Sequence, residues 1–319
     1  MSVAYLVGGR VSLDAAATDR FYESYASVRR SYAQAAAWTG LTVAQLRTEE
    51  LPFQQEERQS RGSLRQSAYV LGLADVLAEE GIRPDLAGGI SLGGMTSSCL
   101  AGAIEREAYL RFLHRQRAVP LRAPELPEHA VARAFFPVQD DPGQYYEPAR
   151  SGVHLAGDFG PVLEGTKRML LLGGERAALE ALAAELPERT VLILEGQTIA
   201  AHTPLRDHET GFMAPYVDAV DFADPVIPLY SSAQPEPKPL ATAGEVREMF
   251  LRNPVAPISM PGLLGQLERG GARLGVILGN SIPKGVIDFP FPVVHLVEPE
   301  DIEEVRSAVA ESAESGANV

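Results

Sequence analysis

The sequence predicts an α/β fold in which a large domain with a parallel sheet carries an inserted small domain. The first observation is an apolar strand pattern at residues 3–7 that ends at two glycines. The second is a short apolar segment at 86–90 that leads into a helix of small residues. The third lies between residues 131 and 195, where the pattern runs strand, helix, strand, strand, helix, strand. That order is typical of a ferredoxin-like unit.

The predicted domain boundaries follow changes in composition. Two prolines and two glutamates at 121–130 indicate a linker, and helical patterns return after about residue 200. We therefore expect residues 1–127 and 198–319 to form the large domain and residues 128–197 to form the small domain. A length of 319 residues is compatible with two domains.

The individual elements are predicted from apolar spacing and from the glycines and prolines that end each run. Val70, Leu73 and Leu77, for example, lie on one helical face before Gly81. In the large domain we expect helices over 15–38, 43–47, 66–80, 93–101, 106–118, 204–222, 245–251, 261–269 and from 300, with further strands at 226–230 and 274–278. In the small domain we expect strands at 131–138, 153–157, 168–173 and 191–195 and helices at 141–149 and 175–186.

Composition excludes several classes of function. The 28 basic against 42 acidic residues give a formal charge of -14, which disfavours a nucleic-acid partner. No stretch approaches the roughly 18 consecutive apolar residues of a membrane span. The single cysteine, Cys99, has no partner for an internal disulfide and is expected to be packed in a helix of small residues. Since the start of the sequence lacks a signal-peptide pattern, we expect a cytoplasmic protein.

The sharpest local motif is Gly-Ile-Ser-Leu-Gly at 89–93, a GxSxG pattern. Glycines on both sides of Ser91 allow a strand to turn abruptly into a helix, so that the hydroxyl projects and the helix N-terminus presents N–H groups. The apolar strand before it and the small-residue helix after it are the context that this motif requires. Ser91 is therefore a candidate nucleophile, and the large domain is predicted to be α/β-hydrolase-like.

A serine nucleophile needs a base, and six histidines are candidates. His202 follows a strand and precedes a helix, in a loop that can return to the cleft. His295 would be the base in the usual α/β-hydrolase chain order, although it lies in an apolar strand pattern that favours a structural role. The other four lie in a strand, in the linker or on helices with charged neighbours: His154, His129, His114 and His208.

Taken together, these segments resemble the malonyl-CoA:acyl-carrier-protein transacylases and the acyltransferase domains of polyketide synthases. The matching pieces, in chain order, are LVGGR, RQSAYVL with Gln66, GISLGG followed by LAGAI, AAHTPL with His202, FLRNPV and LGNS. The resemblance implies a ping-pong mechanism in which Ser91, deprotonated by His202, carries the acyl group between two thiols.

The resemblance also implies roles for main-chain groups. The carbonyl of Phe250 would orient His202, and the N–H groups of Leu92 and Arg10 would form the oxyanion hole. No metal-ligand spacing is present, and no cofactor is expected beyond the phosphopantetheine arm that a carrier protein delivers. Gln66 is expected to line the substrate pocket by the same analogy.

Departures from the family pattern concern the substrate. The arginine that grips a malonyl carboxylate in the family falls on Gln116, and one helical step turns Arg115 and Arg117 away by about 100°. Ile90 and Ala201 replace the residues before the nucleophile and before the histidine. We expect an acyl group without a free carboxylate, and the chain resembles discrete acyltransferases of macrolactam polyketide pathways that move aminoacyl or dipeptidyl units. The alternatives are an editing hydrolase, a malonyl transacylase if the helix register is slipped, and a non-catalytic docking protein.

Donor and acceptor acyl carrier proteins are the expected partners, in transient complexes with a monomer. Carrier proteins are acidic, so a local basic surface is needed on a chain of negative net charge. We expect that surface on the helix after the nucleophile and the segment that follows it, at Arg106, Arg111, Arg115, Arg117 and Arg122.

Overall fold

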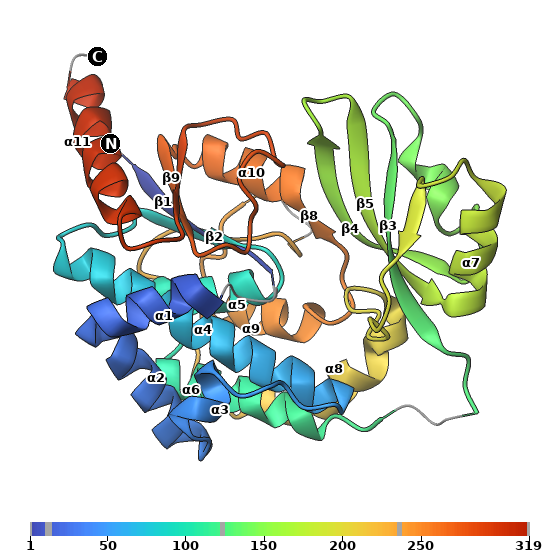
Figure 1. The fold of residues 1–319 in the computed structure, drawn as a ribbon, viewed down its shortest axis with the longest axis horizontal. Coiled ribbons are helices and arrows are strands. Elements are labelled where there is room, and N and C mark those ends of the chain that lie inside the picture. The colour runs from blue at the N-terminus through green and yellow to red at the C-terminus, as the bar shows by residue number, and fades with distance from the viewer. Residues whose placement is uncertain (1, 10–14, 122–124, 235–237, 318–319) are drawn as a thin grey trace.

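The computed structural model describes residues 2–9, 15–121, 125–234 and 238–317, with side chains up to residue 312. The described chain contains two five-stranded sheets that lie side by side (Figure 1). The first sheet is entirely parallel and has the order β10-β9-β1-β2-β7. Its strands are β1 (Val3–Val7), β2 (Leu86–Gly89), β7 (Leu229–Ser231), β9 (Leu274–Leu278) and β10 (Val293–Leu296). The predicted parallel sheet is therefore present.

Helices surround the parallel sheet, with α4, α5 and the helices packed on them on one face and α10 toward the second sheet (Figure 1). Their bounds are α1 (Ala15–Ser24), α2 (Ala26–Thr39), α3 (Val43–Arg47), α4 (Gln55–Glu79), α5 (Leu92–Leu100), α6 (Arg106–Arg115), α8 (Asp207–Asp218), α9 (Ala243–Arg252), α10 (Met260–Arg269) and α11 (Asp301–Ala317). None of the helices that the structure describes is both long enough and apolar enough to cross a bilayer.

The second sheet has the order β6-β3-β5-β4-β8 and is packed by helix α7 (Arg176–Glu185). The first four strands are antiparallel, namely β3 (His129–Pro137), β4 (Val153–Val162), β5 (Lys167–Glu175) and β6 (Val191–Ile193). The fifth, β8 (Ile258–Ser259), pairs parallel with β4 and comes from a part of the chain beyond the predicted insert. One strand of the C-terminal segment thus completes the sheet of the inserted segment.

Several predicted boundaries are wrong. The helix expected over 15–38 is two helices, because the backbone is extended at Tyr25. The helix expected from residue 66 begins at Gln55. Its first turns bury polar side chains, among them Glu56 and Ser60, so the apolar periodicity that marks a helix is missing there.

Three further predictions differ around the linker and the small domain. The helix expected over 106–118 ends at Arg115, and a tighter 3-10 turn covers Gln116–Ala118. The helix expected over 141–149 is a short 3-10 turn at Pro142–Tyr145. His129, expected in a linker, is buried as the first residue of β3. The start of this strand could not be recognised because prolines, which favour turns, come directly before it in the sequence.

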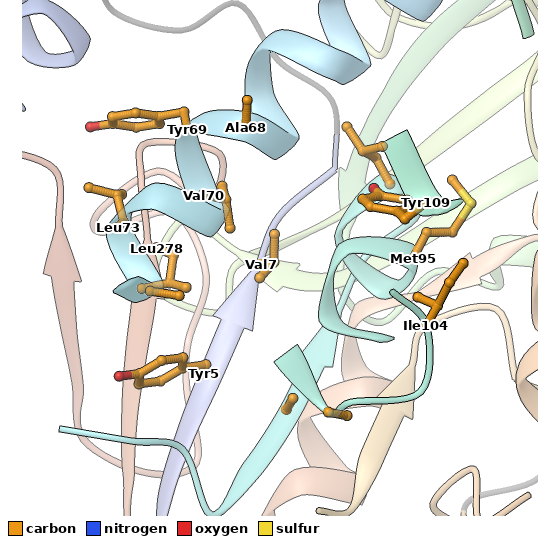
Figure 2. Packing of buried hydrophobic residues seen from close by; sticks show 14 of the residues in the cluster. Tyr5, Val7, Ala68, Tyr69, Val70, Leu73, Met95, Ile104, Tyr109 and Leu278 are labelled. Atoms are coloured by element: carbon orange, nitrogen blue, oxygen red, sulfur yellow. The ribbon is translucent and has the colours of Figure 1, made fainter. Parts of the chain in front are cut away.

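The main core lies between the parallel sheet and helices α4, α5 and α6. Figure 2 shows Tyr69, Val70 and Leu73 of α4 on the side of the sheet where Val7 and Leu278 lie. A buried hydroxyl network fixes α5 in this core, since Ser67 of α4 and Tyr109 of α6 both hydrogen-bond Thr96. This packing holds the start of α5, which follows Ser91, in a defined position.

Candidate active site

Ser91 is placed by a strained turn between β2 and α5. Its backbone has φ 55 and ψ -119, a conformation that a residue with a side chain rarely adopts and that costs of order 1–3 kcal/mol. The main-chain N–H of Ser91 donates to Ser232 Oγ at 3.3 Å, and the N–H of Ser232 donates to the carbonyl of Gly89 at 3.1 Å. The strain is thus held by Ser232, the residue that follows strand β7.

The two glycines of the motif are required for the turn and also because neighbouring backbone lies too close to leave room for a Cβ. A Cβ at Gly89 would overlap the backbone of Gly93, and a Cβ at Gly93 would overlap the backbone of Val7. Close approach of strand, turn and helix explains why this position needs GxSxG. The prediction that the motif forms a strand-to-helix elbow agrees with the structure.

His202 lies against the serine, with Nε2 2.7 Å from Ser91 Oγ. It is buried, and its backbone also has a positive φ of 64°. Its main-chain N–H donates to the carbonyl of Pro254 at 2.6 Å, which ties the loop to the end of α9. Two strained residues from segments 111 positions apart therefore meet in one hydrogen bond.

The structure does not favour the rival base, His295. It lies in β10 at the edge of the parallel sheet, where β9 and β1 separate that strand from β2 and the elbow. Burial, together with the nearby charge of Lys284, lowers the pKa of His295. His154 does not contact Ser91 either. It lies on β4 of the second sheet, and its Nδ1 is 3.5 Å from a carboxylate oxygen of Glu147.

Gln66 supports the loop that follows β1. Its Nε2 donates to the carbonyl of Gly9 at 2.8 Å and lies 3.4 Å from that of Gly8. The N–H of Gly8 in turn donates to Ser281 Oγ at 3.0 Å. Gln66 thus positions the backbone beside the elbow. Arg10, the expected oxyanion residue of this loop, lies outside the described residues.

The other main-chain groups named from the sequence are suitably placed in the chain. Leu92 is the first residue of α5, and the first N–H groups of a helix have no acceptor within it. Phe250 lies in the last turn of α9, and the residue four positions on is Pro254, which has no N–H to donate to its carbonyl. Both groups are thus without the usual helical partner, and their catalytic roles stay predictions.

A small cavity, with room for about one water molecule, lies among α5, α6, α8 and α9. Met95, one helical turn after the serine, and Pro254, bonded to the histidine, both line it. Its other lining residues are Phe112, Gln116, Glu209, Thr210, Met213, Val217, Phe250, Leu251 and Asn253. No lysine, arginine or histidine is among these described lining residues. Of the other expected pocket residues, Ile90 is buried in an apolar cluster on the other face of the sheet, and Ala201 is partly exposed beside His202.

A buried ion cluster lies beside this cavity and shares Glu209 with its lining. Arg206 Nη1 and Nη2 contact Glu56 at 2.9 and 3.2 Å, and its Nε contacts Glu209 at 2.7 Å. Burial alone would lower the pKa of Arg206, but Glu209 and Glu56 outweigh burial and raise it. One cation beside two acidic residues gives the cluster an excess of acidic groups. Sequence reasoning missed this cluster, as well as Ser232 and Pro254, because none of them belongs to a short motif.

The arginines after the nucleophile do not form one uniform free surface. Arg106 makes a two-pronged ion pair with Asp75, at 2.7 Å for each contact, and Arg111 pairs with Glu107. Arg115 lies over the ring of Tyr216, 4.7 Å from its centroid. Arg111 and Arg115, together with Arg117 and Trp38, line an open groove outside the cavity. Arg122 lies outside the described residues.

Two further titratable groups near this helix are not reactive candidates. Burial, and then the positive charges of Arg117 and Arg115, lower the pKa of His114 to about 4. Burial raises the pKa of the Cys99 thiol well above its ordinary value, consistent with the expected packed role. Among the described residues, no cluster of three or more potential metal ligands is found.

Comparison with known proteins identifies the fold. No protein-family model matches the chain, and no curated protein sequence matches it either. Solved structures do match over nearly the whole length. The malonyl-CoA:acyl carrier protein transacylase from Helicobacter pylori has a TM-score of 0.81 at 17% identity and covers 98% of this chain and 99% of its own. The corresponding enzyme from Xanthomonas oryzae has a TM-score of 0.79 at 19% identity, over 96% of this chain and 98% of its own.

A third neighbour was solved with a partner. It is a malonyl-transacylase in complex with a type II polyketide synthase acyl-carrier protein, with a TM-score of 0.77 at 16% identity, over 95% of this chain and 98% of its own. The chain therefore has the fold of malonyl-CoA:acyl carrier protein transacylases, in agreement with the expected resemblance. At this level of identity the likeness concerns the fold, and the activity must be argued from the site.

Proposed function

We propose that the protein is an acyltransferase that moves an acyl group between acyl carrier proteins through an acyl-Ser91 intermediate, in polyketide biosynthesis. The observation that carries the proposal is the 2.7 Å contact between His202 Nε2 and Ser91 Oγ at a strained strand-to-helix elbow. A serine hydroxyl bonded to an imidazole nitrogen is the arrangement of an activated nucleophile. The fold shared with transacylases supports this reaction class.

In the first half-reaction, Ser91 Oγ attacks the carbonyl carbon of a thioester while its proton passes to His202 Nε2. The C–S bond then breaks, and the departing thiolate takes that proton. In the second half-reaction, an acceptor thiol gives its proton to His202 and attacks the acyl-serine, and Ser91 regains a proton as its ester bond breaks. We assign the oxyanion site to the N–H groups of Leu92 and Arg10, each worth about 2.7–4 kcal/mol of barrier, and the orientation of His202 to the carbonyl of Phe250.

The acyl group we propose has no free carboxylate and belongs to the aminoacyl or dipeptidyl class. The described cavity lining contains no cation, and Glu209, which lines the cavity, belongs to an ion cluster of two acidic residues and one arginine. A carboxylate would enter against this charge and without a two-pronged arginine contact. A slipped helix register would be needed for malonyl, yet Arg115 contacts Tyr216 and Gln116 faces the cavity.

We propose that the phosphopantetheine arm of the carrier protein brings the thioester, and that no cofactor is bound by the enzyme itself. For docking we propose the groove side of α6, with Arg111, Arg115 and Arg117 contributing, because an overall charge of -14 requires a local basic surface. Arg106 is engaged with Asp75 and contributes less. We further propose that the protein is a cytoplasmic monomer and that residues 128–197 form a ferredoxin-like domain inserted into an α/β-hydrolase-like one.

The test is a transfer assay with two carrier proteins. A donor carrier loaded with an aminoacyl group is incubated with the enzyme, with and without an unloaded acceptor carrier, and each species is weighed by mass spectrometry. The proposal predicts acyl-acceptor formation that disappears in Ser91→Ala. Release of free acid at the same rate with and without the acceptor would instead indicate an editing hydrolase. The absence of both products, with the wild-type protein folded, would indicate a docking protein.

A further inference from the structure

An arginine without an ion-pair partner lies in the middle of the second sheet. It is Arg133 of β3, and it is exposed to solvent. Among the described residues no acidic side chain pairs with its guanidinium. Two other arginines of this part of the chain are paired, Arg168 with Asp158 and Arg176 with Glu128. Since a guanidinium is always charged, Arg133 offers a positive charge that an anionic ligand can use.

The register of the second sheet places Arg133 on the face that meets the loop of the candidate base. Side chains alternate along a strand, so odd-numbered residues of β3 and β5 lie on one face of the sheet. The opposite face, which includes Leu172, packs against α7. On the face of Arg133, a Cβ added at Gly173 would meet Thr203, the residue after His202. The loop that carries His202 therefore lies against the same face as Arg133.

One row of paired residues runs across this sheet from the elbow to Arg133. From β8 to β6, the residues of the row are Ile258, Gly157, Leu171, Arg133 and Leu192. The β8 end is next to the elbow, because the hydroxyl of Ser232 accepts the N–H of Ser91 and its carbonyl accepts the N–H of Ser259. Neighbouring strands lie about 4.8 Å apart, so the backbone of Arg133 is about 14 Å from that of β8.

This separation matches the length of the arm that carries a thioester. From the thioester sulfur to the phosphorus of its 4′-phosphate, an extended phosphopantetheine arm spans about 16 Å. A sulfur placed beside Ser91 therefore allows the phosphate to lie over Arg133.

The neighbours of Arg133 fit the same end of the arm. Leu171 is partly exposed and Leu192 is 42% exposed. Both flank Arg133 across the sheet, at the roughly 4.5–5.5 Å between Cβ atoms of directly paired residues. Next to its phosphate the arm carries a carbon with two methyl groups, which are apolar like the leucines. The phosphate itself matches the paired N–H groups of a guanidinium.

We infer that Arg133 binds the 4′-phosphate of the phosphopantetheine arm, with Leu171 and Leu192 contacting the two methyl groups beside it. This inference rests on the proposed function, because it concerns the arm that delivers the acyl group to Ser91. It adds a contact for the arm to the α6 arginines proposed for the body of the carrier protein. Since the phosphate is remote from the reacting carbonyl, the contact has the same strength in the ground state and in the transition state, and it acts on KM rather than on kcat.

The test compares the alanyl thioesters of pantetheine, 4′-phosphopantetheine, coenzyme A and a carrier protein as donors to the wild-type protein. Acylation of Ser91 is followed by intact mass over time at a series of donor concentrations. The inference predicts that kcat/KM is about 10-fold higher for phosphopantetheine than for pantetheine, through a lower KM, and that added salt reduces this advantage. Equal KM values for these two donors would overturn the inference and leave the proposed function intact. No acylation by any of the four donors would contradict the proposed function itself.

Variants assign the phosphate advantage to one side chain. Arg133→Gln should reduce it to about 1- to 2-fold, and Arg133→Lys, which keeps the charge without the paired N–H groups, should retain part of it. The matched control is Arg83→Gln, which removes the same charge from an exposed arginine before β2, at the opposite end of that strand from Ser91. This control should keep the full advantage. A phosphate advantage that persists in Arg133→Gln, or that is lost equally in Arg83→Gln, would overturn the assignment.

The coenzyme A and carrier-protein donors separate two sources of the same phosphate. Both carry the 4′-phosphate on an identical arm, so Arg133→Gln should raise KM for both by a similar factor. A rise confined to the carrier-protein donor, with phosphopantetheine and coenzyme A unaffected, would place the contact on the body of the carrier protein and overturn the inference.

Discussion

The buried ion cluster at Arg206, which joins α4 to α8, gives a quantitative test of the packing beside the active site. The side chain of Arg206 is 3% exposed, and those of its partners Glu56 and Glu209 are 6% and 3% exposed. Arg206→Met leaves two buried carboxylates without their cation. Breaking a buried ion pair from one side costs about 3–5 kcal/mol. We expect the free energy of unfolding at pH 7 to fall by that amount, which is a large part of the stability of an ordinary protein.

Equilibrium unfolding in guanidinium chloride measures this loss, and the triple variant Glu56→Gln, Arg206→Met, Glu209→Gln should recover much of it because no charge is then buried. Unpaired burial raises the pKa of a carboxyl group. The deficit of Arg206→Met should therefore shrink as pH falls and the carboxyl groups take up protons. The control is Arg30→Met, which breaks an exposed pair with Glu79 and should cost less than about 1 kcal/mol. A loss in Arg206→Met no larger than in this control would refute the reasoning.

Three other predictions concern the elbow, the base and a buried histidine. Replacing His202 with alanine should slow acylation of Ser91 by about 10²- to 10⁴-fold in single-turnover assays, because a general base is lost. Gly93→Ala should destabilise the protein in thermal unfolding, since the new Cβ overlaps the backbone of Val7, whereas Gly211→Ala meets no atom and should not. The pKa of His114 is lowered from 6.5 to about 4, so His114 takes up its proton at a lower pH in the folded protein than in the unfolded chain. Stability should therefore fall by about 1–2 kcal/mol as pH drops from about 6.5 to 4, after allowance for solvent screening, and His114→Asn should lose less.

The elbow and its histidine could be predicted because their signals are local. Gly89 and Gly93 flank Ser91 within five residues, and the glycines are there because strand, turn and helix touch. His202 needed more, since its distance from Ser91 along the chain is 111 residues and the residues alone left His295 as a rival. The resemblance to transacylases favoured His202, and the contact in the structure agrees.

The polar parts of the fold could not be predicted in the same way. The start of α4 at Gln55 was missed because Glu56, which a periodicity analysis treats as exposed, is buried against Arg206 from 150 positions further on. The pairing of Arg106 could not be predicted for a similar reason. Nothing near Arg106 in the sequence indicates that Asp75 will pair with it. Partners distant in sequence decide whether a charged side chain is free.

The lining of the small cavity shows the same limit. Gln116 could be singled out from the sequence because the transacylase family has an arginine at that position. Asn253 could not, because an asparagine before a proline is an ordinary helix end. Their common cavity results from the packing of α5, α6, α8 and α9, which no local pattern encodes.

The central claim is that Ser91 carries an acyl group without a free carboxylate. The most direct measurement is the intact mass of the protein after exposure to a panel of thioesters that includes malonyl-CoA and an amide-containing acyl thioester. We predict a mass increase equal to the amide-containing acyl group, mapped to Ser91 by peptide analysis and absent in Ser91→Ala, with little or no malonyl adduct. Efficient acylation by malonyl-CoA that is lost in Arg115→Ala or Arg117→Ala, or an adduct that persists in Ser91→Ala, would contradict the account.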